Sequence, residues 1–416
     1  MQTETPAPSR PAATGGLADA VETFRLPLYA RLWTSNLIQF TCFQVLGLAM
    51  QWLVTSLTPS RSALGFVGFV QGGTSALVSP VAGVIVDRYA KRSLIVLGRV
   101  GLASVGLCVA WLVWSGSVAY WHLLVAALVG GVLASVLQPA TQTFVVDVVG
   151  RRRTEHAVAL NAMGSSFGSM GGGALAGVLV GGIGMMATYS IASAGLLVAA
   201  FLVISMRIRG PRANTERSSP WADLREGFAY VRARPPLLLA MLGCSMALFN
   251  GAITPMRPVF ARHVLGVGAT EFGVLSAVHG VGTFAMAIAI TLRPPRRNLG
   301  ILIVGSMLAF AIGLLLYSFA FSYAWALAVE LWLGCAGQLW NVAAITGFQL
   351  AVPEEMRGRV LSMVFTLAQL GFVGVFAVGA LADAVGDQLA LGLFGAIPTL
   401  LLTLLLTFGW RVLKRM

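Results

Sequence analysis

Uncharged apolar stretches recur along the whole chain, and each is long enough to cross a bilayer as a helix, which takes about 20 residues. Short polar hinges separate them. The composition agrees, because 57% of the 416 residues are hydrophobic and only 10% are charged. The twelve predicted spans are residues 32–57, 63–86, 93–116, 119–146, 156–183, 185–206, 237–261, 271–292, 299–319, 322–350, 358–383 and 388–410.

The spans are predicted to be helices rather than barrel strands. Backbone amides inside a bilayer must be paired within the protein, and the alternating pattern of a membrane barrel is missing from these stretches. The sequence therefore predicts an all-α membrane protein with twelve transmembrane helices.

Basic residues indicate the orientation, because Lys and Arg near the ends of spans stay on the cytoplasmic side. Of the 28 Lys and Arg residues, all but Arg61, Arg99, Arg257 and Arg262 lie in the tails or at every second hinge. Both termini are thus predicted to face the cytoplasm of a bacterial cell, with the protein in its plasma membrane. A net charge of +13 spread over these hinges suits anionic lipid, and we expect no nucleic-acid partner.

A long polar interruption divides the spans into two sets of six. Ser219 and Pro220 within it can begin a helix with one apolar face, made of Trp221, Leu224 and Phe228 together with Val231. The first 24 residues have no apolar core of the signal-peptide type, so we expect a disordered tail without a cleaved leader. The predicted units are a cytoplasmic tail (1–31), a six-helix bundle (32–206), a cytoplasmic linker with an amphipathic helix (207–236), a second six-helix bundle (237–410) and a cytoplasmic tail (411–416).

The two halves have similar patterns. Residues 144–163 align with residues 348–367, and each segment places a charged hinge between the fourth and fifth spans of its half. A parallel repeat of six spans is typical of transporters whose halves rock about a site near the middle of the membrane.

The hinge between the second and third spans carries the strongest motif. Residues 83–92 read Gly-Val-Ile-Val-Asp-Arg-Tyr-Ala-Lys-Arg, which resembles the signature G-x-x-x-D-R-x-G-R-K of the major facilitator superfamily at its usual place. Ala90 stands where the family usually has Gly. The resemblance implies the major facilitator fold, in which two pseudo-symmetric six-helix bundles pack side by side.

The same resemblance implies a gate at the cytoplasmic side. Asp87, Lys91 and Asp147 would form a charge cluster that closes this side and breaks when the bundles rock. Gly83 would permit close helix approach. Anchoring of the topology is a simpler role for the basic residues, but it does not explain Asp87. The implied gate residues are Gly83, Asp87, Arg88, Lys91, Arg92 and Asp147.

Two longer segments, residues 138–161 and 257–283, are similar to those of the exporter branch that includes the enterobactin exporter and macrolide efflux proteins. Antiporters of the superfamily commonly carry a Gly-Pro element in the fifth span, whereas this chain has Ala174 where Pro is expected. Export therefore rests on the branch resemblance. Glycines of the fifth span would allow tight contact with a helix of the other bundle. They are Gly168, Gly171, Gly172, Gly173 and Gly177.

Charged residues inside the membrane are costly and are therefore functional candidates. Glu330 in the tenth span and Arg257 in the seventh are predicted to pair toward the outer side. Protonation or substrate binding at Glu330 would then release Arg257, and a fixed structural ion pair is the alternative. Pro255 and Pro258 should bend or break the seventh span. Arg99 is expected to reach back to the inner interface, with a substrate contact as the alternative.

Uncharged polar residues in several spans are candidates for the substrate cavity, although any of them can instead bond a neighbouring helix. They are Asn36, Gln39, Gln44, Gln138, Asn161, Asn250, His279, Gln338 and Asn341. A large, mostly apolar site with few charges suits an amphiphilic organic molecule better than a sugar or an inorganic ion. Arg257 and Arg99 leave room for an anionic substrate such as a siderophore.

The sequence thus predicts a monomeric secondary active transporter that exports small amphiphilic compounds by alternating access, coupled to proton antiport, with a role in drug resistance. Alternatives are a siderophore or metabolite exporter of narrow specificity, a nutrient uptake transporter, and a channel or receptor. We expect neither an enzyme nor a cofactor, because the hinges lack a nucleotide loop and a nucleophile with an adjacent base. Four cysteines, far apart inside spans, indicate neither a metal site nor disulfides: Cys42, Cys108, Cys244 and Cys335.

Overall fold

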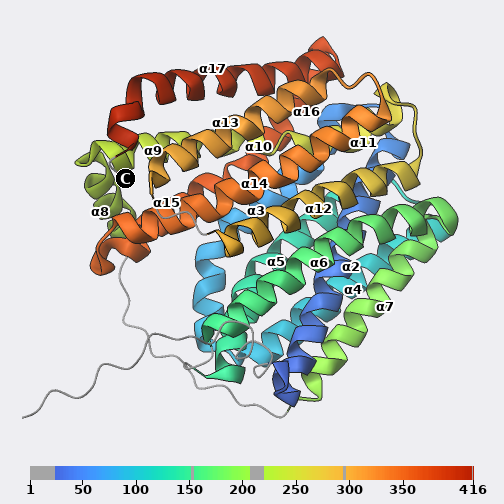
Figure 1. Ribbon diagram of the computed structural model, residues 1–416. Coiled ribbons are helices and arrows are strands. Elements are labelled where there is room, and N and C mark those ends of the chain that lie inside the picture. The colour runs from blue at the N-terminus through green and yellow to red at the C-terminus, as the bar shows by residue number, and fades with distance from the viewer. Residues whose placement is uncertain (1–23, 151–153, 207–219, 294–296, 415) are drawn as a thin grey trace, which may run out of the picture.

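The computed structural model describes residues 24–150, 154–206, 220–293, 297–414 and 416, and within them every regular element is a helix. Figure 1 shows the elements by label. The first six crossings are α2 (Pro27–Leu57), α3 (Arg61–Arg88), α4 (Lys91–Trp114), α5 (Tyr120–Val149), α6 (Thr154–Gly182) and α7 (Gly184–Ile204). A short helix, α8 (Pro220–Arg232), lies in the linker.

The last six crossings form the C-terminal bundle, coloured yellow-green to red in Figure 1. Two crossings are interrupted, so this bundle has more helices than crossings. Its elements are α9 (Pro235–Ser245), α10 (Ala247–Asn250), α11 (Ile253–Val259), the π-helix η2 (Phe260–Val264), α12 (Ala269–Leu292), α13 (Leu299–Ser318), α14 (Tyr323–Ala351), α15 (Glu354–Gln369), α16 (Gly371–Val385) and α17 (Asp387–Leu413).

The seventh crossing is broken, as the two prolines predict. Pro255 and Pro258 cannot donate the backbone hydrogen bonds that would continue a regular helix. The crossing is divided into α9, α10 and α11, and it ends in a π-turn in which the Leu265 amide donates to the Phe260 carbonyl at 2.8 Å. The break starts earlier than the prolines, because α9 already ends at Ser245.

Ten segments of the described chain are long and apolar enough to cross a membrane. The two other crossings, α6 and α14, are each 29 residues long but fall outside this set. Glycine and serine lower the hydropathy of α6, and α14 carries Glu330, Gln338 and Asn341. The twelve-helix fold predicted from the sequence is confirmed.

The two bundles repeat the same packing. In the N-terminal bundle α3 packs on α5, α4 on α5 and α4 on α7; the equivalent C-terminal pairs are α12 with α14, α13 with α14 and α13 with α17. This correspondence is the pseudo-symmetry expected of a duplicated six-helix unit.

Two helix pairs make most of the contact between the bundles in the described chain: α6 packs on α12, and α3 packs on α16. Glycines bring α6 close to α12, since a Cβ on Gly177 would lie 2.7 Å from the Cα of Gly273 and one on Gly173 would lie 3.0 Å from the Ala277 amide nitrogen. The prediction of glycine contacts across the bundles was wrong for three positions. Gly168 and Gly172 instead face α2 of their own bundle, and Gly171 faces open space.

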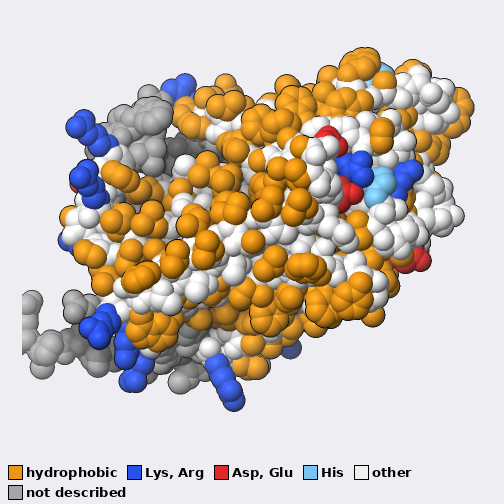
Figure 2. Space-filling model, turned by 90° about the horizontal axis from the view of Figure 1, so that it is seen from above, with side chains coloured by type: hydrophobic (Ala, Val, Ile, Leu, Met, Phe, Trp, Pro, Cys, Tyr) orange, Lys and Arg blue, Asp and Glu red, His pale blue; other side chains and the backbone are white. Residues whose placement is uncertain are grey.

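The helix ends fall into two groups, named here after the predicted orientation. The inner end carries Lys91 and the C-terminus of α17, and the outer end carries Arg61 and the N-terminus of α17. Figure 2 shows Lys and Arg gathered at the left end and a broad hydrophobic surface between the two ends. Most of the acidic side chains visible in this view lie toward the opposite end. This arrangement fits a protein that spans a membrane.

The linker helix α8 packs against α9 and α15 at the inner end. Val231 is buried, whereas Phe228 is exposed, so the predicted apolar face is divided between the protein and its surroundings. Glu226 on α8 forms an ion pair with Arg359 on α15 at 2.8 Å. The side chains of Trp221 and Leu224 lie outside the part that the structure describes.

Candidate functional site

Three charged or titratable side chains from three helices meet inside the C-terminal bundle. The Arg257 guanidinium on α11 donates to both carboxylate oxygens of Glu330 on α14, with Nε at 2.7 Å from Oε1 and Nη2 at 2.9 Å from Oε2. His279 Nδ1 on α12 lies 3.0 Å from Glu330 Oε2. The structure therefore joins the predicted Arg257–Glu330 pair and adds His279, which the sequence suggested only as a cavity residue.

Burial makes this cluster energetically demanding. Glu330 is completely buried, and Arg257 is 8% exposed. A buried ion pair is tolerated only when its geometry is good, and removing one partner typically costs about 3–5 kcal/mol because the other charge is left unpaired. The bidentate contact meets this requirement. The His279 side chain, at 28% exposed, is the most accessible member of the cluster.

A second buried cluster, in the N-terminal bundle, surrounds Arg99 on α4. Arg99 is completely buried, so the prediction that it reaches the inner interface was wrong. All five of its N–H groups donate to neutral oxygens, which stabilises the charge within the bundle and leaves none for a substrate. The acceptors are Ser35 Oγ, Asn36 Oδ1, Gln39 Oε1, which accepts twice, and the Ala199 carbonyl.

The cavity candidates divide into three groups. Asn36 and Gln39 are bound to Arg99, and Asn161 Oδ1 accepts from Asn36 Nδ2 at 2.8 Å, so these three belong to the network within the bundle. Gln44 lines a cavity. Four others are half-buried or exposed, and their contact with substrate stays a prediction: Gln138, Asn250, Gln338 and Asn341.

At the inner end, Lys91 Nζ and Asp147 Oδ2 form an ion pair at 2.8 Å. Arg92 donates to the Val203 and Ile204 carbonyls at the C-terminus of α7. These contacts lie within the N-terminal bundle and do not themselves join the two bundles.

The three remaining gate residues are Gly83, Arg88 and Asp87, and the expectation for one of them needs correction. A Cβ on Gly83 would meet nothing within 4 Å, so the close helix approach predicted there is absent from this conformation. Arg88, the last residue of α3, is exposed. The side chain of Asp87 lies outside the described part of the structure.

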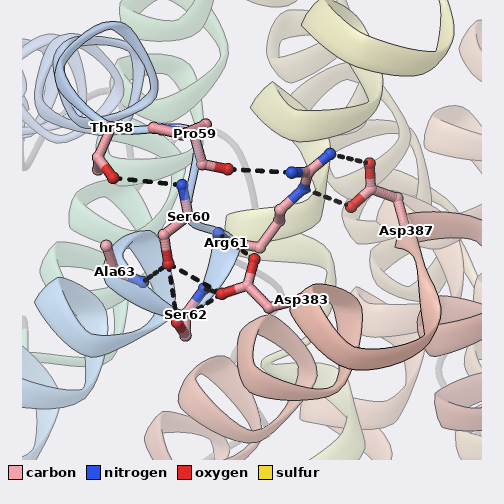
Figure 3. Close-up of polar contacts among 8 residues, drawn as sticks. All are labelled: Thr58, Pro59, Ser60, Arg61, Ser62, Ala63, Asp383 and Asp387. Carbon is pink, nitrogen blue, oxygen red and sulfur yellow. Dashed lines mark hydrogen bonds and ion pairs between the residues drawn. The ribbon is translucent and has the colours of Figure 1, made fainter.

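The outer end carries a charged contact that joins the bundles (Figure 3). The Arg61 guanidinium at the start of α3 pairs with Asp387 at the start of α17, at 2.8 Å from Nε to Oδ1 and 3.1 Å from Nη2 to Oδ2. Asp383 near the end of α16 accepts the backbone amides of Arg61 and Ser62, both at 2.8 Å, and the Ser60 hydroxyl at 2.8 Å. We refer to Ser60, Arg61, Ser62, Asp383 and Asp387 as the outer latch.

The outer latch is a helix cap supplied by the other bundle. The first amides of a helix have no partner within the helix, and they favour a negative charge. Asp383 provides this charge to α3. Gly386, with φ of 93°, allows the sharp turn between α16 and α17 that brings Asp383 and Asp387 to the same place.

Comparison with known proteins identifies the family. The family model described as Major Facilitator Superfamily matches residues 32–375, which is most of the chain. The chain belongs to the major facilitator superfamily. It is a transporter and not an enzyme, as the sequence predicts.

The transporter is similar to exporters from enteric bacteria. It is 27% identical over 346 residues to the enterobactin exporter EntS of Salmonella typhimurium, covering 80% of each chain. It is 26% identical over 342 residues to EntS of Escherichia coli O81, again covering 80% of each. The predicted resemblance to an exporter branch is thus confirmed.

Solved structures share the fold of the transporter. A POT family transporter superposes with a TM-score of 0.75 at 11% identity, over 92% of this chain and 96% of that one. The nucleoside transporter NupG gives 0.73 at 12% identity, over 92% and 99%. A bacterial homologue of the human lysosomal transporter Spinster gives 0.69 at 14% identity, over 96% and 97%.

Sequence reasoning missed the outer latch of the transporter. Arg61 was recognised only as a basic residue on the outer side, and Asp383 and Asp387 were not considered. A signal was present in the sequence, because Ser60 is a typical helix N-cap residue. In the C-terminal bundle, Asp383 and Asp387 lie on either side of Gly386, at the turn between the last two spans. Spacing along the chain did not show that these segments, more than 300 residues apart, would meet.

Proposed function

We propose that the transporter exports small amphiphilic organic compounds by alternating access, using proton antiport as its driving force. The observation that carries the proposal is the buried Glu330 carboxylate, held by Arg257 and bonded to the more accessible His279. A secondary transporter driven by protons needs an intramembrane group that can gain and lose a charge, and acidic residues with histidine serve this purpose.

The cluster supplies a simple coupling step. Ionised Glu330 holds Arg257 through two charge-assisted hydrogen bonds. A proton that reaches Glu330 by way of His279 neutralises the carboxylate and removes the attraction on Arg257. Because α12 carries His279 and also packs on α6 of the other bundle, a rearrangement around Glu330 acts directly on a bundle interface.

The outer latch supports alternating access. Its contacts, together with the Gly173 and Gly177 contacts of α6, hold the bundles together toward the outer end. We expect a substrate to approach from the inner side while the latch is closed. Release to the outside requires the latch to open, and its Arg61–Asp387 ion pair is partly accessible to water, so breaking it costs little.

A siderophore exporter of narrow specificity is the second candidate. The specific observation in its favour is that the curated relatives are exporters of enterobactin. The large apolar surface of the crossings and the few charged side chains inside them fit either a broad or a narrow range of amphiphilic molecules.

Transport in inverted membrane vesicles tests the proposal. An imposed proton gradient should drive uptake of some members of a panel of dyes, macrolides and siderophores, and uptake should saturate. Glu330→Gln should abolish the dependence on the gradient. Glu271→Gln is the matched control, since Glu271 only caps the N-terminus of α12 outside the cluster, where it accepts from the Gly268 amide at 3.0 Å.

Three results would contradict the proposal. Unchanged gradient-driven flux in Glu330→Gln removes this residue from the coupling. Flux that is indifferent to the gradient in the unaltered protein rules out antiport. Flux that does not saturate and never accumulates its solute indicates a channel.

A further inference from the structure

A cavity of about 220 Å³ lies inside the N-terminal bundle, in the half nearer the outer end. Helices α2, α4 and α5 supply most of its wall, and α3 and α7 contribute one residue each. It is distinct from the Glu330 cluster, which belongs to the other bundle.

The polar part of the wall is uncharged. It consists of Gln44, Gln51, Gln71 and Tyr189, and the described residues of the lining include no Asp, Glu, Lys, Arg or His. Tyr189 is only 3% exposed, yet its hydroxyl has no partner among the described residues, and neither has the buried Gln51 Oε1. Buried polar groups of this kind are normally hydrogen-bonded. Two such groups without a hydrogen-bond partner beside a cavity therefore indicate that a ligand in the cavity supplies the partner.

Missing side chains create the space. Gly47 on α2 and Gly130 on α5 line the cavity together with Ala126. Gly106 on α4 also lines it, but a Cβ there would clash with Ser193 Oγ, so this glycine allows close packing on α7. A Cβ on Gly47 would meet nothing within 4 Å, so this face of α2 borders open volume. Arg99 lies one turn before Leu102 of the wall, but its N–H groups are all occupied, so it adds no anion-binding capacity.

We propose that this pocket binds an uncharged ring of the exported compound, one that carries hydroxyl or amide groups. Three carboxamides and a phenol offer both donors and acceptors and no charge, and the rest of the wall is aliphatic or aromatic. Pockets that enclose whole drug-sized ligands measure roughly 300–1,000 Å³, so this one accepts a single moiety. It is also far larger than the roughly 10–15 Å³ that one water needs. The inference rests on the proposed function and specifies its substrate class.

Equilibrium binding of 7-hydroxycoumarin and coumarin to the full chain in lipid nanodiscs tests the pocket, with empty nanodiscs to subtract partitioning. The unaltered protein should prefer the hydroxylated compound. Gly47→Leu should weaken its binding at least about tenfold by filling the pocket. Gly305→Leu is the matched control, because a Cβ on Gly305 of α13 also meets nothing within 4 Å, away from the pocket. Both changes replace a helix glycine by a better helix former, so both variants should fold.

Tyr189→Phe isolates the hydrogen bond, since it removes the hydroxyl and keeps the ring. The preference for 7-hydroxycoumarin over coumarin should fall about three- to tenfold, the size of one neutral hydrogen bond. Binding of the hydroxylated compound that is equal in Gly47→Leu and Gly305→Leu overturns the inference, as does a pocket filled by water only, with no saturable binding. If vesicle transport persists in either case, the proposed function stands without the pocket. If gradient-driven transport is absent while coumarin binding follows the pattern above, the function fails and the pocket remains.

Discussion

Two arginines are buried among the described residues, and they are held in opposite ways. Arg257 in the C-terminal bundle is paired with a carboxylate, whereas Arg99 in the N-terminal bundle is surrounded by hydroxyl, carboxamide and carbonyl oxygens. Both are well hydrogen-bonded, which is the condition for burying a charge. They differ in their response to a proton. A proton can neutralise Glu330, whereas the described residues around Arg99 include no acidic group that a proton could neutralise.

This difference separates a fixed element from one that can switch. The Arg99 cluster ties α4 to α2 and α7 through many bonds, none of which depends on an acidic group. The Arg257 cluster depends on the ionisation of one side chain. We therefore expect the N-terminal bundle to act as the rigid partner and the C-terminal bundle to contain the response to protons.

The largest effect should come from Arg99→Met. Three side-chain acceptors would lose the donor that Arg99 supplies in the interior, while the Ala199 carbonyl keeps the Ser35 hydroxyl. Leaving buried polar groups unpaired costs about 1–3 kcal/mol for each group that finds no other partner. The thermal midpoint of the purified protein in detergent should fall sharply, with little folded protein recovered. Arg293→Met, at an exposed position after α12, is the control. A midpoint equal to that of the control would show that the Arg99 network is not a clamp.

Glu330→Ala should be the next largest change in stability. It leaves Arg257 without its counter-charge, at a cost of about 3–5 kcal/mol. The double variant Arg257→Met with Glu330→Leu should recover most of this loss, because replacing a buried pair by apolar residues is often neutral. No matching double variant exists for Arg99, because it has no acidic partner among the described residues. Comparing the thermal unfolding of Arg99→Met with that of the double variant therefore tests the difference between the two arginine clusters. If the double variant also transports with a normal proton dependence, the pair is structural only.

Asp383→Asn should have a moderate effect on conformation and little on stability. The amide weakens the cap on α3, and loss of about 1–2 kcal/mol shifts the balance toward an outer-open form roughly five- to thirtyfold. Distances between spin labels at the outer ends of α3 and α16 measure this shift. Because the latch touches neither arginine cluster, the proton dependence of transport should be unchanged. An altered dependence would mean that latch and cluster are not separable.

The smallest effect should come from exchanging the charges of the inner pair, Lys91→Asp with Asp147→Lys. The pair lies within one bundle, so reversing it preserves the attraction, and the change in stability should stay within about 1 kcal/mol. Transport close to that of the unaltered protein is expected, while Lys91→Asp alone should lower it. Loss of transport in the exchanged variant would show that the inner pair has a role in gating that depends on the sign of each charge.

The sequence predicted those site residues whose position inside a membrane span is energetically costly. Glu330 and Arg257 were recognised because a charge inside an apolar stretch is expensive unless it is paired. Arg99 was recognised for the same reason, but its position near a span end favoured an exposed guanidinium. The alternative, a set of neutral acceptors from α2 and α7, depends on how three helices rotate against one another, and this does not follow from the pattern of any one helix.

The sequence by itself determined the twelve crossings, the duplication and the family, because apolar length, basic hinges and the motif at residues 83–92 are local properties of the chain. Only the tertiary structure decided which polar groups meet. Asp383 caps α3 from the other bundle, His279 joins Glu330, and a pocket opens where Gly47 leaves space. These features depend on helix rotation and on distances between segments far apart in the chain, and a bilayer-spanning pattern constrains neither.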